Sequence, residues 1–65
     1  MKEVEAKANR LLRESFLDKQ LRAFIVLSVV GLKLKQGQEF TEKRRKLNRL
    51  FDSMISRVAN QGGAA

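Results

Sequence analysis

The chain has 65 residues, and its 14 lysines and arginines outnumber its acidic residues so that the formal net charge is +7. This length allows one domain at most, and so short a chain buries only about 60% of its unfolded surface, which makes oligomerisation a common reinforcement. Disulfides and the common zinc ligands are excluded, because the sequence contains neither cysteine nor histidine.

Catalytic residue types are poorly represented. Histidine is the usual general base near neutral pH and cysteine is a common nucleophile, and the sequence lacks both. The serines have no evident activating partner, and so short a chain rarely encloses a water-excluded pocket. We therefore expect no enzyme, no metal site and no cofactor.

The N-terminal sequence MKEVEAKANRLLRES carries charges of both signs. A secretory signal peptide would continue into an apolar segment, which does not follow here. The absence of cysteine fits a reducing compartment. We expect a protein of the cytoplasm, or of the nucleoid or nucleus if it binds nucleic acid.

The first predicted helix begins at Lys2. Val4, Ala8 and Leu11 follow the i, i+4, i+7 spacing of an amphipathic helix. Further along, the apolar stripe changes side, because at 100° per residue Leu17 and the apolar positions after it lie roughly opposite the first stripe.

Two interpretations stay open near residue 15. In one, the helix ends near Glu14 and restarts at Phe16, because Ser15 and Asp18 form a capping pair before an apolar run. In the other, a single long helix covers residues 2–35 and its two halves bury different faces. Since no glycine or proline lies nearby, we favour the long helix, bent near residue 15.

An uncharged run, AFIVLSVVGL, lies between Arg22 and Lys33. A helix that spans a membrane needs about 20 apolar residues, so we do not expect a span here. The β-branched residues make a strand at 24–30, in an intertwined dimer, a competing interpretation. We favour a helix, because the preceding segment has helical periodicity without a turn signal and Gly37 fits the position just past a helix end.

The same run predicts self-association. A helix that is apolar on every side is expected to be buried on every side, and one short partner helix covers only one of them. We therefore predict a homodimer or a larger helical bundle. The predicted oligomer interface consists of Leu21, Phe24, Ile25, Val26, Leu27, Val29, Val30, Leu34, Phe51 and Met54.

A second amphipathic helix is predicted over residues 41–60, after a turn at 36–40, with Thr41 as its N-cap. It should fold back on the long helix. The predicted fold is thus all-α, an antiparallel helical hairpin in one domain over residues 1–60, with a disordered tail at 61–65. The apolar face of this helix consists of Leu47, Leu50, Phe51, Met54, Ile55 and Val58.

The clearest functional signal is the basic sequence EKRRKLNRLF. In a helix that begins at Thr41, these cations occupy the first turn, where unpaired N–H groups and guanidinium groups together favour a phosphate. The backbone of nucleic acid is the commonest partner with this chemistry, although a solvated helix face is the simpler alternative. The candidate anion-binding residues are Lys43, Arg44, Arg45, Lys46, Arg49 and Arg57.

The leading hypothesis is a basic helical homo-oligomer that binds the phosphate backbone of DNA or RNA, in a regulatory or associated role. The alternative is a helical-hairpin adaptor or structural subunit, which inserts into the groove of a partner or meets an acidic protein surface. A third hypothesis is a membrane-surface peptide, since basic charge beside an apolar run suits anionic lipids. The absence of tryptophan and tyrosine counts against it.

Overall fold

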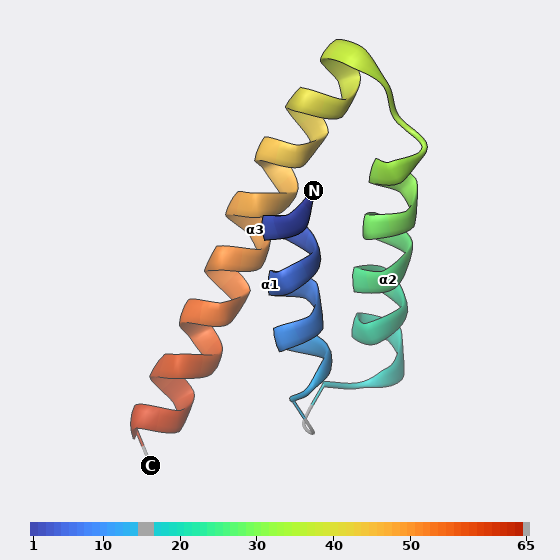
Figure 1. Cartoon of the computed structure of the whole chain (residues 1–65). Helices are drawn as coiled ribbons and strands as arrows, with labels where there is room; N and C mark the ends of the chain where they lie inside the picture. Colours follow the sequence, from blue (N-terminus) through green and yellow to red (C-terminus); the bar gives the residue numbers. More distant parts are fainter. Residues whose placement is uncertain (15–16, 65) are drawn as a thin grey trace.

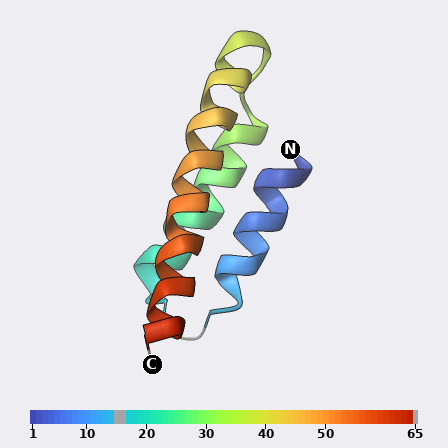
Figure 2. The same ribbon diagram turned by 90° about the vertical axis from the view of Figure 1, so that its left-hand side faces the viewer.

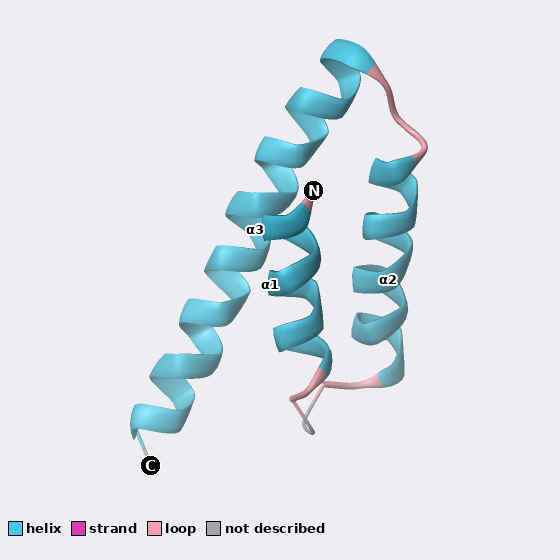
Figure 3. Ribbon diagram, viewed as in Figure 1, coloured by secondary structure: helices cyan, strands magenta, loops and turns pink. Residues whose placement is uncertain are grey.

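The computed structural model describes residues 1–14 and 17–64, and within them the chain is entirely helical apart from two short connections (Figure 1 and Figure 3). Consecutive helices run in opposite directions (Figure 1). The predicted all-α class is confirmed over these residues, and the strand considered at 24–30 is not found, because that segment is helical. The three helices are α1 (Lys2–Leu12), α2 (Lys19–Lys33) and α3 (Gly37–Ala64).

The favoured long helix over residues 2–35 is wrong, because α1 and α2 are separate helices. Asp18 has extended backbone angles and caps α2, its side-chain oxygen accepting a hydrogen bond of 2.7 Å from the backbone N–H of Leu21. The cap of the predicted S-x-x-D pair is thus the aspartate, and Ser15 and Phe16 lie outside the described residues. In one continuous helix, the apolar stripes before and after residue 15 would lie on opposite sides. Because α1 and α2 are separate helices, both stripes can face one common core.

The connection between α1 and α2 is held by an arginine. The Arg22 side chain donates hydrogen bonds to the backbone oxygens of Leu17, at 3.2 Å, and Glu14, at 3.0 Å. Both carbonyls belong to the connection, where helix hydrogen bonding stops and backbone groups need other partners. Arg22 therefore helps to set the angle at which α2 returns along α1.

α3 begins four residues earlier than predicted. Gly37, with φ of +60°, is the first residue of the helix, and the Phe40 N–H donates to the Gln36 carbonyl. Glycine takes this left-handed conformation without steric cost, which lets the chain reverse within a short connection. Thr41 is consequently not the N-cap: it lies inside α3 and its hydroxyl donates to the Gly37 carbonyl at 3.3 Å.

The C-terminal end of α3 also differs from the prediction. The helix continues to Ala64, through residues that were expected to form a disordered tail, while Ala65 lies outside the described residues. At 1.5 Å per residue its 28 residues are about 42 Å long, which matches the 43 Å long axis of the molecule. α3 therefore sets the length of the fold.

α1 packs against both other helices, and its contact with α3 is the most extensive in the molecule. Figure 2 shows α1 standing beside the pair formed by α2 and α3. The expected hairpin of two helices is thus not confirmed. The fully covered core contains Val4, Ala8 and Leu11 of α1, Ile25 and Leu32 of α2, and Phe51 of α3.

Candidate binding surfaces

The six predicted anion-binding residues, here called the basic face, all lie on α3 and are solvent-exposed. Their place along the helix differs from the prediction. Because α3 begins at Gly37 and the Phe40 N–H donates to the Gln36 carbonyl, the unpaired N–H groups of its first turn belong to residues 37–39, and Lys43 comes about one turn later. The prediction that these cations share the first turn with the free N–H groups is therefore wrong, while anion binding by the six residues stays a prediction.

Among the described residues, the cations of the basic face have no ion pair. The three ion pairs within the described residues use Lys7, Lys33 and Lys35 instead. Arg44 lies over the ring of Phe40, with its guanidinium carbon 5.8 Å from the ring centroid, a weak cation–π contact at an exposed site. The basic face thus keeps its charge available for an outside anion.

Carboxylates reduce the charge along one edge of the basic face. Arg45, Lys46 and Arg49 line a shallow hollow together with Glu42 and Asp52. Asp52 is itself paired with a lysine of α1, which lowers its effect on the neighbouring arginines. The face is therefore positive overall: Asp52 is turned toward α1 by its ion pair, and Glu42 is the other carboxylate of the hollow.

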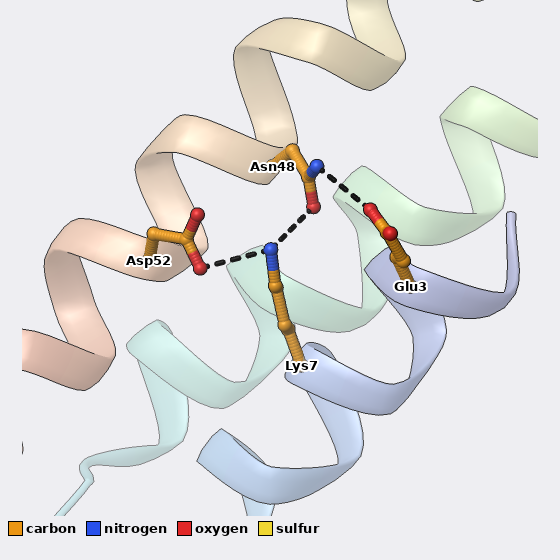
Figure 4. Close-up of polar contacts among 4 residues, drawn as sticks. All are labelled: Glu3, Lys7, Asn48 and Asp52. Atoms are coloured by element: carbon orange, nitrogen blue, oxygen red, sulfur yellow. Dashed lines mark hydrogen bonds and ion pairs between the residues drawn. The ribbon is translucent and has the colours of Figure 1, made fainter.

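A polar cluster joins α1 to α3, and Figure 4 shows its four side chains. The Lys7 ammonium group lies 2.9 Å from a carboxylate oxygen of Asp52 and donates a 2.8 Å hydrogen bond to the side-chain oxygen of Asn48. The Asn48 side-chain nitrogen donates to the Glu3 carboxylate at 3.2 Å. Asn48 is thus engaged within the chain, although it lies between the cations of the basic face in the sequence.

Two of the ten predicted interface residues belong to the core. Ile25 and Phe51 are 0% exposed within the single chain, so in this fold they hold the three helices together instead of meeting a second molecule. Val29 and Met54 are half-buried and pack at the edge of the same core.

The other six predicted interface residues all belong to α2 or the residue that follows it, and they are exposed. Leu34 is 78% exposed and Leu27 is 68% exposed, and the informative feature is that six exposed apolar side chains lie so close together in the sequence. The single chain therefore leaves part of α2 uncovered, and the burial of this part in an oligomer stays a prediction. The exposed set is Leu21, Phe24, Val26, Leu27, Val30 and Leu34.

α2 and α3 also form a groove that the sequence pattern did not reveal. One hollow of about 340 Å³ lies between α2 and the first half of α3, and a second of about 320 Å³ continues toward Met54. The two hollows share Phe24 and Leu50, and we call them together the α2–α3 groove. Its apolar and small lining residues include Leu21, Phe24, Ser28, Gly31, Leu32, Leu47, Leu50 and Met54.

The charged side chains that line the α2–α3 groove are all cations: Lys35, Lys43, Lys46 and Arg57. Lys35 has a loose ion pair with Glu39, at 3.7 Å, while the other three have no ion pair among the described residues. The groove therefore combines an apolar floor with a positive rim. Sequence periodicity places residues on one helix but does not show which faces of two helices border the same space.

One ion pair outside these surfaces links α1 to α2. The Lys33 ammonium group lies 2.8 Å from a carboxylate oxygen of Glu5. Its hydrogen bond and its positive charge hold the pKa of the Glu5 carboxyl below the ordinary value.

Comparison with known proteins returns no match, whether to protein-family models, to curated proteins or to solved structures. In the described part of the chain, no helix has the length and apolar character needed to cross a membrane.

Proposed function

We propose that the protein is a small interaction module, an adaptor or structural subunit that works by docking α2 and its surroundings onto a partner protein. The observation that carries this proposal is the exposure of six large apolar side chains on or next to one short helix. Contiguous exposed apolar surface usually marks a protein–protein or membrane contact. Solvation alone accounts for exposed lysines, but it does not account for exposed Phe24 and Leu27.

Site-specific photocrosslinking in the cells that make the protein tests this proposal. A photoreactive residue at Leu27 should give a discrete adduct, and the same residue at the exposed Arg10 of α1 should give none. An adduct of twice the chain mass would identify a second copy, as predicted from the sequence, and a larger or smaller one would identify a different protein. Absence of any adduct at Leu27 and at Leu34 would contradict the proposal.

A second candidate function is binding to the phosphate backbone of nucleic acid, and a separate observation favours it. The six cations of the basic face have no ion pair among the described residues, and from Lys43 to Arg57 they extend over about 21 Å of helix. A positive surface of this kind can contact several phosphates, with an affinity that falls steeply as salt rises.

Fluorescence anisotropy of labelled duplex DNA and single-stranded RNA, at low and near-physiological salt, tests this second function. The double change Arg45→Glu/Arg49→Glu should abolish binding, because it reverses two central charges of the basic face. The matched change Arg10→Glu/Arg13→Glu alters the net charge equally at the C-terminal end of α1, where Arg13 is the C-cap, and this variant should retain most of the binding. If both variants lose binding equally, and no binding remains near physiological salt, the basic face is only a solvated surface and not a nucleic-acid site.

A further inference from the structure

We propose that the α2–α3 groove receives an amphipathic helix of a partner protein, and that this partner helix is acidic. This inference rests on the proposed function as an interaction module and names the chemistry of the partner. Bound in this groove, the partner would complete a bundle of four helices, with its apolar stripe on the groove floor and its carboxylates on the basic rim.

The dimensions of the groove fit a helix. Along α2 the groove extends from Leu21 to Leu32, which is about 17 Å at 1.5 Å per residue and equals about three turns of a partner helix. α3 leans away from α2 toward its C-terminal end (Figure 1). The two hollows of the groove are lined by residues of both helices. Helices that dock in grooves insert anchor side chains at i, i+3, i+4 and i+7, and a groove of this length accommodates such a set.

The floor of the groove offers apolar surface that this chain leaves uncovered. Phe24 is 47% exposed, Leu50 is 39% exposed and Leu21 is 38% exposed, and all three line the groove. Phe24 and Leu50 border both hollows, so they lie at the centre of the groove. Covering such side chains is the main source of affinity in helix recognition, because it removes apolar area from water.

Gly31 supports a close approach by a partner backbone. Glycine inside a helix costs about 1 kcal/mol relative to alanine, and Gly31 does not have the positive φ that would require glycine. A Cβ atom built at Gly31 would meet nothing within 4 Å, so packing within this chain does not require glycine either. Gly31 and Ser28, one turn earlier, both line the groove, where small side chains let a second helix come near.

Charge selects among the candidate occupants. The rim carries Lys43, Lys46 and Arg57 without ion pairs among the described residues, so an occupant with carboxylates gains attraction along the whole groove. A second copy of α2 would bring no carboxylate, because Lys19–Lys33 contains neither aspartate nor glutamate. A nucleic acid backbone has the charge but lacks an apolar stripe to cover Phe24 and Leu50. An acidic amphipathic helix satisfies both requirements.

The test uses a labelled peptide of about 18 residues, designed as a helix with leucine at heptad positions a and d and glutamate at e and g. A matched peptide carries lysine in place of glutamate. Anisotropy should show that the acidic peptide binds at least about tenfold more tightly than the basic one. The amide NMR signals of Phe24 and Gly31 should shift on binding.

Two protein variants and a control locate the site. Gly31→Leu fills the groove, so it should weaken peptide binding by about tenfold or more while raising the thermal midpoint of the free protein, since leucine is the better helix former. Lys43→Glu/Lys46→Glu should also weaken binding. Lys2→Glu/Arg10→Glu changes the net charge equally, away from the groove, and should leave binding nearly unchanged. Unaltered binding to Gly31→Leu would overturn the assignment.

The remaining outcomes separate this inference from the proposed function. If both peptides bind equally and shift Val26 and Leu27, the protein is still an interaction module but the groove assignment is wrong. If neither peptide binds, three other probes are compared: phosphatidylglycerol vesicles, duplex DNA and a higher protein concentration. A shift of the groove signals with one of them means that the groove receives a membrane surface, nucleic acid or a second copy of the chain, respectively, and not an acidic helix. If none of these ligands shifts the groove signals, an adduct at Leu27 or Leu34 in the photocrosslinking experiment overturns the groove assignment alone. The absence of an adduct at both positions overturns both proposals.

Discussion

α1 and α2 differ in a way that hydrophobicity alone does not predict. α1 is the more polar helix, yet it supplies Val4, Ala8 and Leu11 to the fully covered core. α2 is far more apolar, yet it supplies only Ile25 and Leu32. The two helices thus contribute to the core in the reverse order of their apolar content.

In this chain, the way a helix packs depends on how its apolar residues are distributed around its axis and not on how many it has. α1 has one apolar stripe, and α2 and α3 together are enough to cover it. α2 is apolar around most of its circumference, and two neighbouring helices cover only part of that surface. The excess apolar surface of α2 is therefore available to a partner, and each prediction below tests a part of this difference.

The largest effect should come from Phe51, the fully covered core residue of α3. Phe51→Ala should cost about 3–5 kcal/mol of unfolding free energy, because it leaves a cavity at a side chain that is 0% exposed. Domains of this size have only about 3–10 kcal/mol in total, so the variant should be largely unfolded. Urea denaturation followed by circular dichroism at 222 nm measures the difference.

The matched change on the uncovered side of α2 is Leu27→Ala. Leu27 is 68% exposed, so truncating it should alter the unfolding free energy by less than about 0.5 kcal/mol. If Phe51→Ala and Leu27→Ala lower the unfolding free energy by similar amounts, the outer side of α2 is covered, which would contradict the difference between α1 and α2.

A smaller effect is expected at the start of α2. Asp18→Ala removes the hydrogen bond from the side chain to the Leu21 N–H and should cost about 1 kcal/mol. Asp18→Asn should cost much less, because asparagine is an equally good N-cap. If the Asp18→Ala variant is as stable as the unaltered protein, Asp18 does not cap a helix, and α1 and α2 are not the two separate helices described here.

The polar cluster gives a still smaller effect on the α1 side. A double-mutant cycle with Lys7→Met and Asp52→Asn should give a coupling free energy of about 0.5–1 kcal/mol, because Lys7 is only 25% exposed. The cycle for Lys35 and Glu39, a looser and more exposed pair, should give a value near zero. Equal coupling in both cycles would show that the polar cluster does not hold α1 against α3.

The smallest effect is a pH dependence at the contact between α1 and α2. The pKa of Glu5 is lowered below its ordinary value of 4.5, first by its hydrogen bond with Lys33 and then by the charge of that lysine. The contact therefore stabilises the fold above pH 4.5, and this stabilisation is lost as the pH falls through the lowered pKa. Glu5→Gln should remove this part of the acid sensitivity in thermal unfolding scans, and identical profiles would contradict the ion pair.

Local patterns in the sequence predict much of the fold. The spacing of Val4, Ala8 and Leu11 identifies the face of α1 that is buried, and the stripe around Phe51 identifies the inner face of α3. The helix break near Asp18 was weighed but not favoured, because no glycine or proline marks it. The helix breaks there because only two separate helices can bury both apolar stripes in one core. That requirement arises from tertiary packing and not from a local signal such as a glycine or proline.

The binding surfaces were predicted less well, for related reasons. The start of α3 depends on the left-handed conformation of Gly37, and moving it from Thr41 removes the cations from the first turn. The polar cluster pairs residues more than 40 positions apart, as in Lys7 with Asn48, so no local pattern reveals it. The exposed part of α2 also depends on how many other helices of the chain pack against it, which the α2 sequence alone does not show.

Solvent accessibility of methyl groups in solution tests the central claim most directly. In dilute protein, a soluble gadolinium chelate should strongly broaden the methyl NMR signals of Leu27 and Leu34 and should spare those of Val4, Leu11 and Leu32. This result would show that the core is complete within one chain while the outer side of α2 stays open to a partner. Equal protection of Leu27 and Leu32 at every accessible dilution would contradict the account.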